Sequence, residues 1–67
     1  MLYFVNKYAQ SNGDHEVHTG SCTYLPQPFN RQYLGDFASC ASAVAEAKQY
    51  YPPANSCYFC STACYTT

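Results

Sequence analysis

Charged side chains are scarce in this sequence. Only three residues are basic (Lys7, Arg31 and Lys48), and the formal net charge is −1. Proteins that bind nucleic acids without sequence preference need several Lys and Arg side chains to neutralise phosphates. We therefore expect no nucleic-acid partner.

Long apolar runs are also missing. The most apolar stretch at the N-terminus covers residues 1–5, which is too short for a signal peptide or a membrane-spanning helix. We therefore expect a cytoplasmic protein that makes no membrane contact. In a reducing cytoplasm, clustered thiols bind metal more often than they form disulfides.

The chain is too short to rely on a hydrophobic core alone. Its 67 residues form a single domain, residues 1–67, and folding of a chain this size buries only about 60% of the unfolded surface. An additional covalent or metal cross-link is therefore expected. The sequence has eight Tyr and four Phe but no Trp, and so many aromatic rings predict an exposed aromatic patch of the kind found at protein interfaces.

Three short strands are predicted. Residues 2–8 are rich in aromatic and β-branched side chains and residues 15–19 alternate, while Asn12-Gly13 between them indicates a tight hairpin turn. Residues 33–37 predict a third strand. Residues 52–56 are interpreted as a turn.

One helix is predicted over residues 40–51, because this segment is Ala-rich and is followed by Pro52-Pro53. Asp36 or Ser39 is expected to cap it. The helical period places five residues on one face, which we expect to pack on the core: Cys40, Ala43, Val44, Ala47 and Tyr51. The predicted class is α+β: a small antiparallel β-sheet with one α-helix packed across it and a C-terminal cysteine knuckle.

Two spacings predict a metal site. Cys57 and Cys60 form a C-x2-C pair, and His18 and Cys22 form an H-x3-C pair. Each spacing lets a short loop direct two ligands towards one point, and two such pairs complete the tetrahedron that Zn²⁺ prefers. Cys64 is the alternative fourth ligand in place of His18.

The remaining His and Cys residues have simpler interpretations. Strand alternation places Glu16 and His18 on one face and His15 on the other, so His15 is interpreted as a surface imidazole. Cys40 is interpreted as a small buried core residue, with a disulfide to Cys64 as the alternative under oxidising conditions.

Other chemistry of the C-x2-C pair has to be weighed. Cys57 and Cys60 could instead form a disulfide, stay as buried thiols or act as a redox dithiol. A thioredoxin-like C-x-x-C opens a helix, whereas this one follows the predicted helix. Nucleophilic catalysis also needs a positioned base and a third group. Cys22 with His18 is the only candidate pair, and the sequence shows neither a third member nor an oxyanion-stabilising motif for it, so we do not expect an enzyme.

Several small motifs occur in an order known from one family. Within residues 15–60 they are His18, Cys22, Asn30-Arg31, Phe37, Ala43-Val44-x-Glu46-Ala47, Cys57 and Cys60. This order resembles the Ada-type metal-binding domain, the zinc module of bacterial alkylation-repair regulators. The resemblance implies a bacterial source, the α+β fold and a bound Zn²⁺.

The sequence departs from that family at two places. The family has two cysteines in the first ligand pair, one of them the methyl-accepting nucleophile, whereas this chain has His18 in the first position. The family also has basic residues after the final C-x2-C that hold DNA, and residues 61–64 contain none. The resemblance therefore does not imply DNA repair.

The predicted function is a small structural-zinc module that mediates a protein–protein contact or self-association. The alternatives are a metal-free protein held by disulfides and a thiol-based redox sensor or enzyme. The sequence does not identify the partner.

Overall fold

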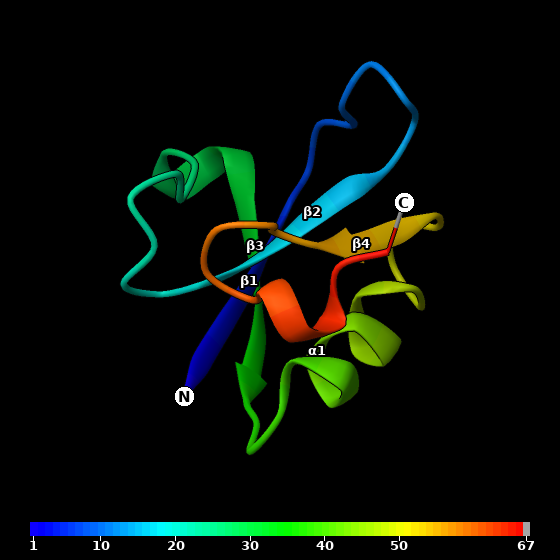
Figure 1. Cartoon of the computed structure of the whole chain (residues 1–67). Coiled ribbons are helices and arrows are strands. Elements are labelled where there is room, and N and C mark those ends of the chain that lie inside the picture. Colours follow the sequence, from blue (N-terminus) through cyan, green and yellow to red (C-terminus); the bar gives the residue numbers. More distant parts are fainter. Residues whose placement is uncertain (67) are drawn as a thin grey trace.

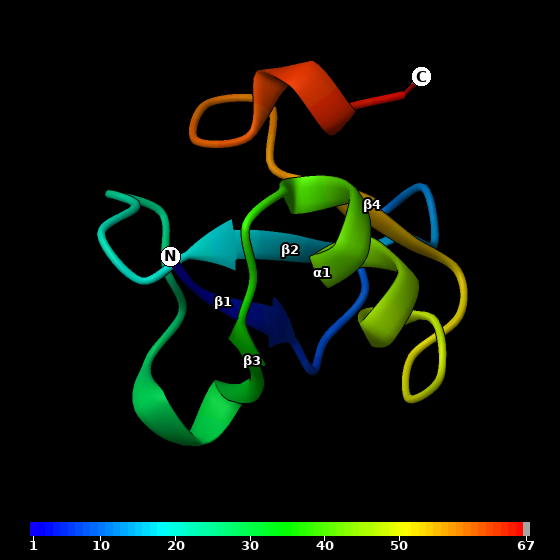
Figure 2. The same ribbon diagram turned by 90° about the horizontal axis from the view of Figure 1, so that it is seen from below.

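The computed structural model describes residues 1–66, which form one four-stranded sheet with a helix across it (Figures 1 and 2). The order of strands across the sheet is β3-β1-β2-β4. The elements are β1 (Leu2–Asn6), β2 (His15–Thr19), β3 (Arg31–Asp36), α1 (Cys40–Ala47) and β4 (Ala54–Ser56), with 3-10 helices η1 (Pro28–Asn30) and η2 (Thr62–Cys64). The predicted α+β class is confirmed.

The predicted hairpin is present, but the connection between its strands is longer than expected. β1 and β2 pair antiparallel, with Phe4 opposite His18 and Val5 opposite Val17. The connection takes residues 7–14 rather than a two-residue turn, and within the described chain only glycines, among them Gly13 at φ +94°, adopt positive φ. Within this connection the chain turns tightly at residues 10–14, where the Gly13 N–H donates to the Gln10 carbonyl and the Gln10 N–H to the Asp14 carbonyl (each 2.9 Å), but Asn12 does not adopt the positive φ expected of it.

The fourth strand was not predicted. β4 pairs parallel with β2, with Glu16 opposite Asn55 and Val17 opposite Ser56, so the sheet is mixed rather than antiparallel and the interpretation of residues 52–56 as a turn is wrong. The strand has only three residues and shows no apolar alternation. All three are buried, so their strand conformation comes from tertiary contacts, including hydrogen bonds between the Asn55 side chain and the backbone of Thr66.

The helix presents the predicted face but ends earlier. Ser39, one of the two residues predicted to cap the helix, accepts a hydrogen bond from the Ser42 N–H. The helix ends at Ala47 rather than Tyr51. The predicted face packs on the sheet: Ala43 and Ala47 are buried in the core with Tyr3, Val5, Val17, Leu34 and Ala54, and Cys40, Val44 and Tyr51 pack against it.

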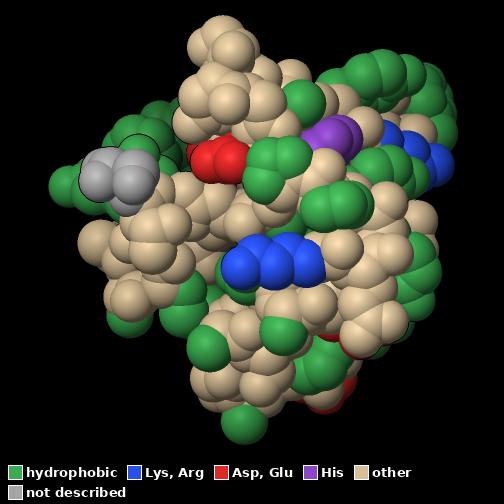
Figure 3. Space-filling view, turned by 90° about the vertical axis from the view of Figure 1, so that its right-hand side faces the viewer, with side chains coloured by type: hydrophobic (Ala, Val, Ile, Leu, Met, Phe, Trp, Pro, Cys, Tyr) green, Lys and Arg blue, Asp and Glu red, His purple; other side chains and the backbone are tan. Residues whose placement is uncertain are grey.

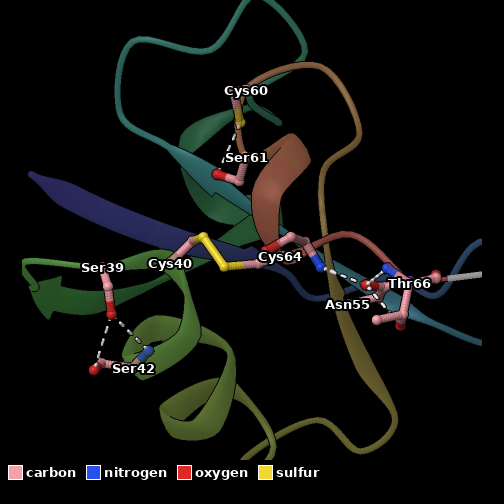
Figure 4. The surroundings of a disulfide bond; sticks show 9 residues. Ser39, Cys40, Ser42, Asn55, Cys60, Ser61, Cys64 and Thr66 are labelled. Carbon is pink, nitrogen blue, oxygen red and sulfur yellow. Dashed lines mark hydrogen bonds between the residues drawn. A yellow bond between two sulfur atoms is a disulfide. The ribbon is translucent and has the colours of Figure 1, made fainter.

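A disulfide joins the first residue of α1 to η2, between Cys40 and Cys64 (Figure 4). The interpretation of Cys40 as a free core thiol is therefore wrong, and the alternative pairing is confirmed. Disulfides are rare in reducing compartments, so this bond gives no support to the expected cytoplasmic location, which stays a prediction.

The surface carries few charges. Figure 3 shows one face on which Lys, Arg, Asp and Glu side chains are scattered among apolar and uncharged groups. None of the helices in residues 1–66 has the length and apolar character needed to cross a membrane. Several large apolar side chains are exposed at this sparsely charged surface, among them Phe29 at 80% and Phe59 at 68%.

Candidate metal centre

Two neighbouring strands bring the predicted ligand pairs together. His18 lies in β2, and Cys22 lies in the turn that follows it, where the Cys22 N–H donates to the Thr19 carbonyl (3.1 Å). Cys57 directly follows β4, and its N–H donates to the Val17 carbonyl (2.8 Å). Because β2 and β4 are parallel, both chain segments leave the sheet at the same edge.

The four side chains converge closely enough to share one ion. The ligand atoms of His18, Cys22, Cys57 and Cys60 all lie within 4.8 Å of one another. The Sγ atoms of Cys22 and Cys57 are 3.9 Å apart, close to the separation of about 3.8 Å that two thiolates adopt on a tetrahedral zinc with Zn–S bonds of about 2.3 Å. His18 and Cys57 are each 1% exposed, while Cys22 and Cys60 are half-buried.

The two nitrogens of the His18 ring have different surroundings. Nε2 lies 3.2 Å from Oε1 of Glu16. Nδ1 is buried and has no hydrogen-bond partner among the described residues. A buried polar atom without a partner costs about 1–3 kcal/mol, so the vacant lone pair fits a metal ligand. Burial lowers the pKa of His18, which favours the neutral imidazole that metals bind.

Backbone amides support two of the sulfurs. The Thr19 N–H donates to Cys60 Sγ and the Tyr24 N–H donates to Cys22 Sγ, each at 3.4 Å. Ser61 Oγ lies 3.7 Å from Cys60 Sγ (Figure 4). Amide donors stabilise the thiolate form, which is the form that binds metal.

The thiols differ in how readily they ionise. Burial raises the pKa of Cys22 to about 12, although the Tyr24 N–H acts in the opposite direction. Burial also acts to raise the pKa of Cys60, but hydrogen bonds from Thr19, Cys22 and Ser61 outweigh it and leave that pKa below its ordinary value. A metal ion must displace the proton of Cys22 at neutral pH, so its affinity should increase with pH.

The alternative candidates lie elsewhere. Cys64 is bonded to Cys40, which corrects the alternative prediction in which Cys64 replaces His18 in the ligand set. Cys57 and Cys60 are both free thiols and do not form the disulfide considered from the sequence. His15 is half-buried rather than on the surface: its Nδ1 lies 2.9 Å from the Asn6 carbonyl and its ring stacks on Tyr51.

The sequence reasoning missed the groups around the ligands. Glu16 was placed on the same face as His18, and the two-residue spacing was the signal that could have identified it as a partner of the imidazole. The amides of Thr19 and Tyr24 carry no sequence signal, because every residue except proline has the same N–H group. Their role depends on how the turn after β2 is folded.

Four aromatic rings, three of them exposed, lie close to the candidate ligands in the sequence and contact one another. Tyr24 packs on Phe59 (4.8 Å between ring centroids), Phe59 on Tyr58 (5.4 Å) and Tyr58 on Tyr65 (5.3 Å). We call these four residues the aromatic row. Tyr58 and Phe59 lie between the two cysteines of the C-x2-C pair, so the loop that supplies two ligands also positions half of the row.

One hollow is lined both by members of the row and by two of the candidate ligands. Its volume is about 280 Å³, and it is lined by Met1, Thr19, Ser21, Cys22, Thr23, Tyr24, Phe59 and Cys60.

No protein-family model, curated protein or solved structure matches this chain, and the resemblance to the Ada-type domain stays a prediction from the sequence.

Proposed function

We propose that this chain is a structural-zinc module in which His18, Cys22, Cys57 and Cys60 bind one Zn²⁺. The observation that carries the proposal is the convergence of one imidazole and three free thiols within 4.8 Å. Three sulfur ligands and one nitrogen ligand suit zinc, which accepts both in a tetrahedral arrangement.

The proposed role of the ion is to hold the fold together. All four positions of a tetrahedral ion would be filled by the protein, which is typical of structural sites, whereas catalytic zinc keeps one position open for water or substrate. The ion would cross-link the C-terminal ends of β2 and β4, because the ligands lie in or just after these two strands. It would complement the Cys40–Cys64 disulfide, which links α1 to η2.

Titration with Co²⁺, which occupies tetrahedral zinc sites and is coloured, tests this proposal. We expect saturation at one ion per chain, with the strong visible absorption of tetrahedral cobalt and the near-ultraviolet charge-transfer bands of thiolate ligands. Zn²⁺ should displace the colour. Binding should weaken as the pH falls, because protons compete for Cys22.

Two histidine variants test whether His18 itself is a ligand in this titration. His18→Ala should lose the tetrahedral spectrum or bind Co²⁺ far more weakly, while His15→Ala should keep both spectrum and stoichiometry, since His15 lies outside the cluster. Pale octahedral spectra without saturation, or equal effects of the two substitutions, would contradict the assignment.

A second proposed role is self-association through the aromatic row. Its members Tyr24, Tyr58 and Phe59 are exposed, and none of the four side chains is charged. An interface around a two-fold axis places the same surface against itself, and an uncharged aromatic surface can do so without like-charge repulsion. Aromatic side chains are also enriched among residues that dominate interface energies.

Replacement of Phe59 by serine is expected to weaken self-association at least about tenfold, because truncation of an aromatic hot-spot residue costs about 2 kcal/mol or more and about 1.4 kcal/mol corresponds to tenfold. Phe29→Ser is the matched control, since Phe29 is 80% exposed but lies outside the row. Sedimentation equilibrium over a range of concentrations measures both. A parent chain that stays monomeric throughout, or equal effects of the two substitutions, would contradict this role.

A further inference from the structure

The buried imidazole of His18 is held on one side only. Its Nε2 lies 3.2 Å from Oε1 of Glu16, and the side chain of Glu16 is 22% exposed while that of His18 is 2% exposed. Its Nδ1 is enclosed without a hydrogen-bond partner in the described chain. An ionised carboxylate can accept a proton donor but cannot donate a hydrogen bond, so the Glu16 oxygen 3.2 Å away favours the tautomer that carries the proton on Nε2.

The pair is also held on rigid backbone. Glu16 and His18 are two residues apart in β2 and therefore point to the same face. β2 is an inner strand: its His18 lies opposite Phe4 of β1, and its Glu16 lies opposite Asn55 of β4. Pairing with β1 and β4 restricts the movement of β2, so the Glu16 carboxylate and the His18 imidazole keep their relative position.

We propose that Glu16 is a positioning residue that keeps the proton of His18 on Nε2 and thereby presents Nδ1 to the metal. This inference rests on the proposed metal site and adds which ligand atom is used and what orients it. Rotation of the ring to present Nε2 instead would break the contact with Glu16 and place Nδ1 beside the carboxylate. A second group that orients a metal-bound histidine is a general feature of metal sites, and its loss commonly lowers affinity about 10- to 100-fold.

Substitution of Glu16 by glutamine tests the positioning role. Glutamine keeps the size of the side chain but replaces the anionic acceptor by a neutral amide, so E16Q should bind Zn²⁺ about 10- to 100-fold more weakly in competition with a chromophoric chelator. E46Q is the matched control. Glu46 is half-buried on α1 and accepts a hydrogen bond from the Tyr50 hydroxyl, so it undergoes the same chemical change away from the centre.

A measurement on the unaltered chain does not depend on how well a variant folds. In ¹⁵N-labelled protein loaded with ¹¹³Cd²⁺, we expect scalar coupling between cadmium and Nδ1 of His18, and a slowly exchanging proton on Nε2. Coupling to Nε2 would overturn the inference, as would equal affinities of E16Q and E46Q.

The two proposals fail in different ways. If the parent chain takes up neither Zn²⁺ nor ¹¹³Cd²⁺, the proposed metal site is wrong and the role of Glu16 is wrong with it. If the parent chain binds one ion but the coupling is to Nε2, only the role of Glu16 is wrong.

Discussion

Replacement of Cys57 by alanine is expected to abolish tight Zn²⁺ binding and to leave most of the chain unfolded at room temperature. Cys57 is 1% exposed, and its sulfur lies 3.9 Å from that of Cys22. Structural zinc contributes on the order of 10 kcal/mol or more in small domains, whereas whole domains are stable by only about 5–15 kcal/mol. Circular dichroism and chelator competition measure the two effects.

Ser56→Ala is the matched control for this substitution. Ser56 precedes Cys57, is fully buried and has a hydroxyl without a hydrogen-bond partner among the described residues. Its removal should leave metal binding unchanged and should not destabilise the fold, because an unpaired buried hydroxyl is itself unfavourable. A Cys57→Ala chain that is as stable as Ser56→Ala would mean that the thiol is not a ligand.

Removal of the disulfide should have the second-largest effect. The double variant Cys40→Ala/Cys64→Ala is expected to lose about 3.5 kcal/mol of unfolding free energy, the loop-closure value for a loop of roughly 25 residues; the two cysteines are 24 positions apart in the sequence. Denaturant unfolding of the zinc-loaded chains, compared under non-reducing conditions, measures the difference.

The same double variant separates the two cross-links. Because Cys64 is bonded to Cys40 and lies outside the cluster of four, the variant should still bind one Zn²⁺ per chain. A loss of stoichiometric binding would show that Cys64 is a ligand after all. An unchanged unfolding free energy would show that the disulfide does not stabilise the folded chain.

Local patterns predicted most of the fold. The β2 strand over residues 15–19, the helix start near Cys40 and the face that carries Ala43 and Ala47 follow from alternation, capping and helical period. The end of the helix was misjudged because Pro52 was taken as its limit. The chain leaves the helix after Ala47, through tighter turns in which Gln49 and Tyr50 bond three residues back.

Long-range pairing explains what was missed. β4 has three residues, two of them polar, and it becomes a strand only beside β2. The four candidate ligands were recognised from their spacing, but the spacing alone could not show that a parallel β2–β4 pair would bring them together. The state of each thiol also depends on three-dimensional proximity, which is why the Cys40–Cys64 disulfide was predicted only as an alternative.

The most direct test of the metal site is the zinc content of the purified chain, combined with its thermal unfolding before and after treatment with a strong chelator. The Cys40–Cys64 bond should be kept intact by omitting reductant. We predict one Zn²⁺ per chain and a loss of the cooperative unfolding transition when the metal is removed, with recovery when zinc is returned. A chain that contains no metal and unfolds at the same temperature with and without the chelator would contradict the account.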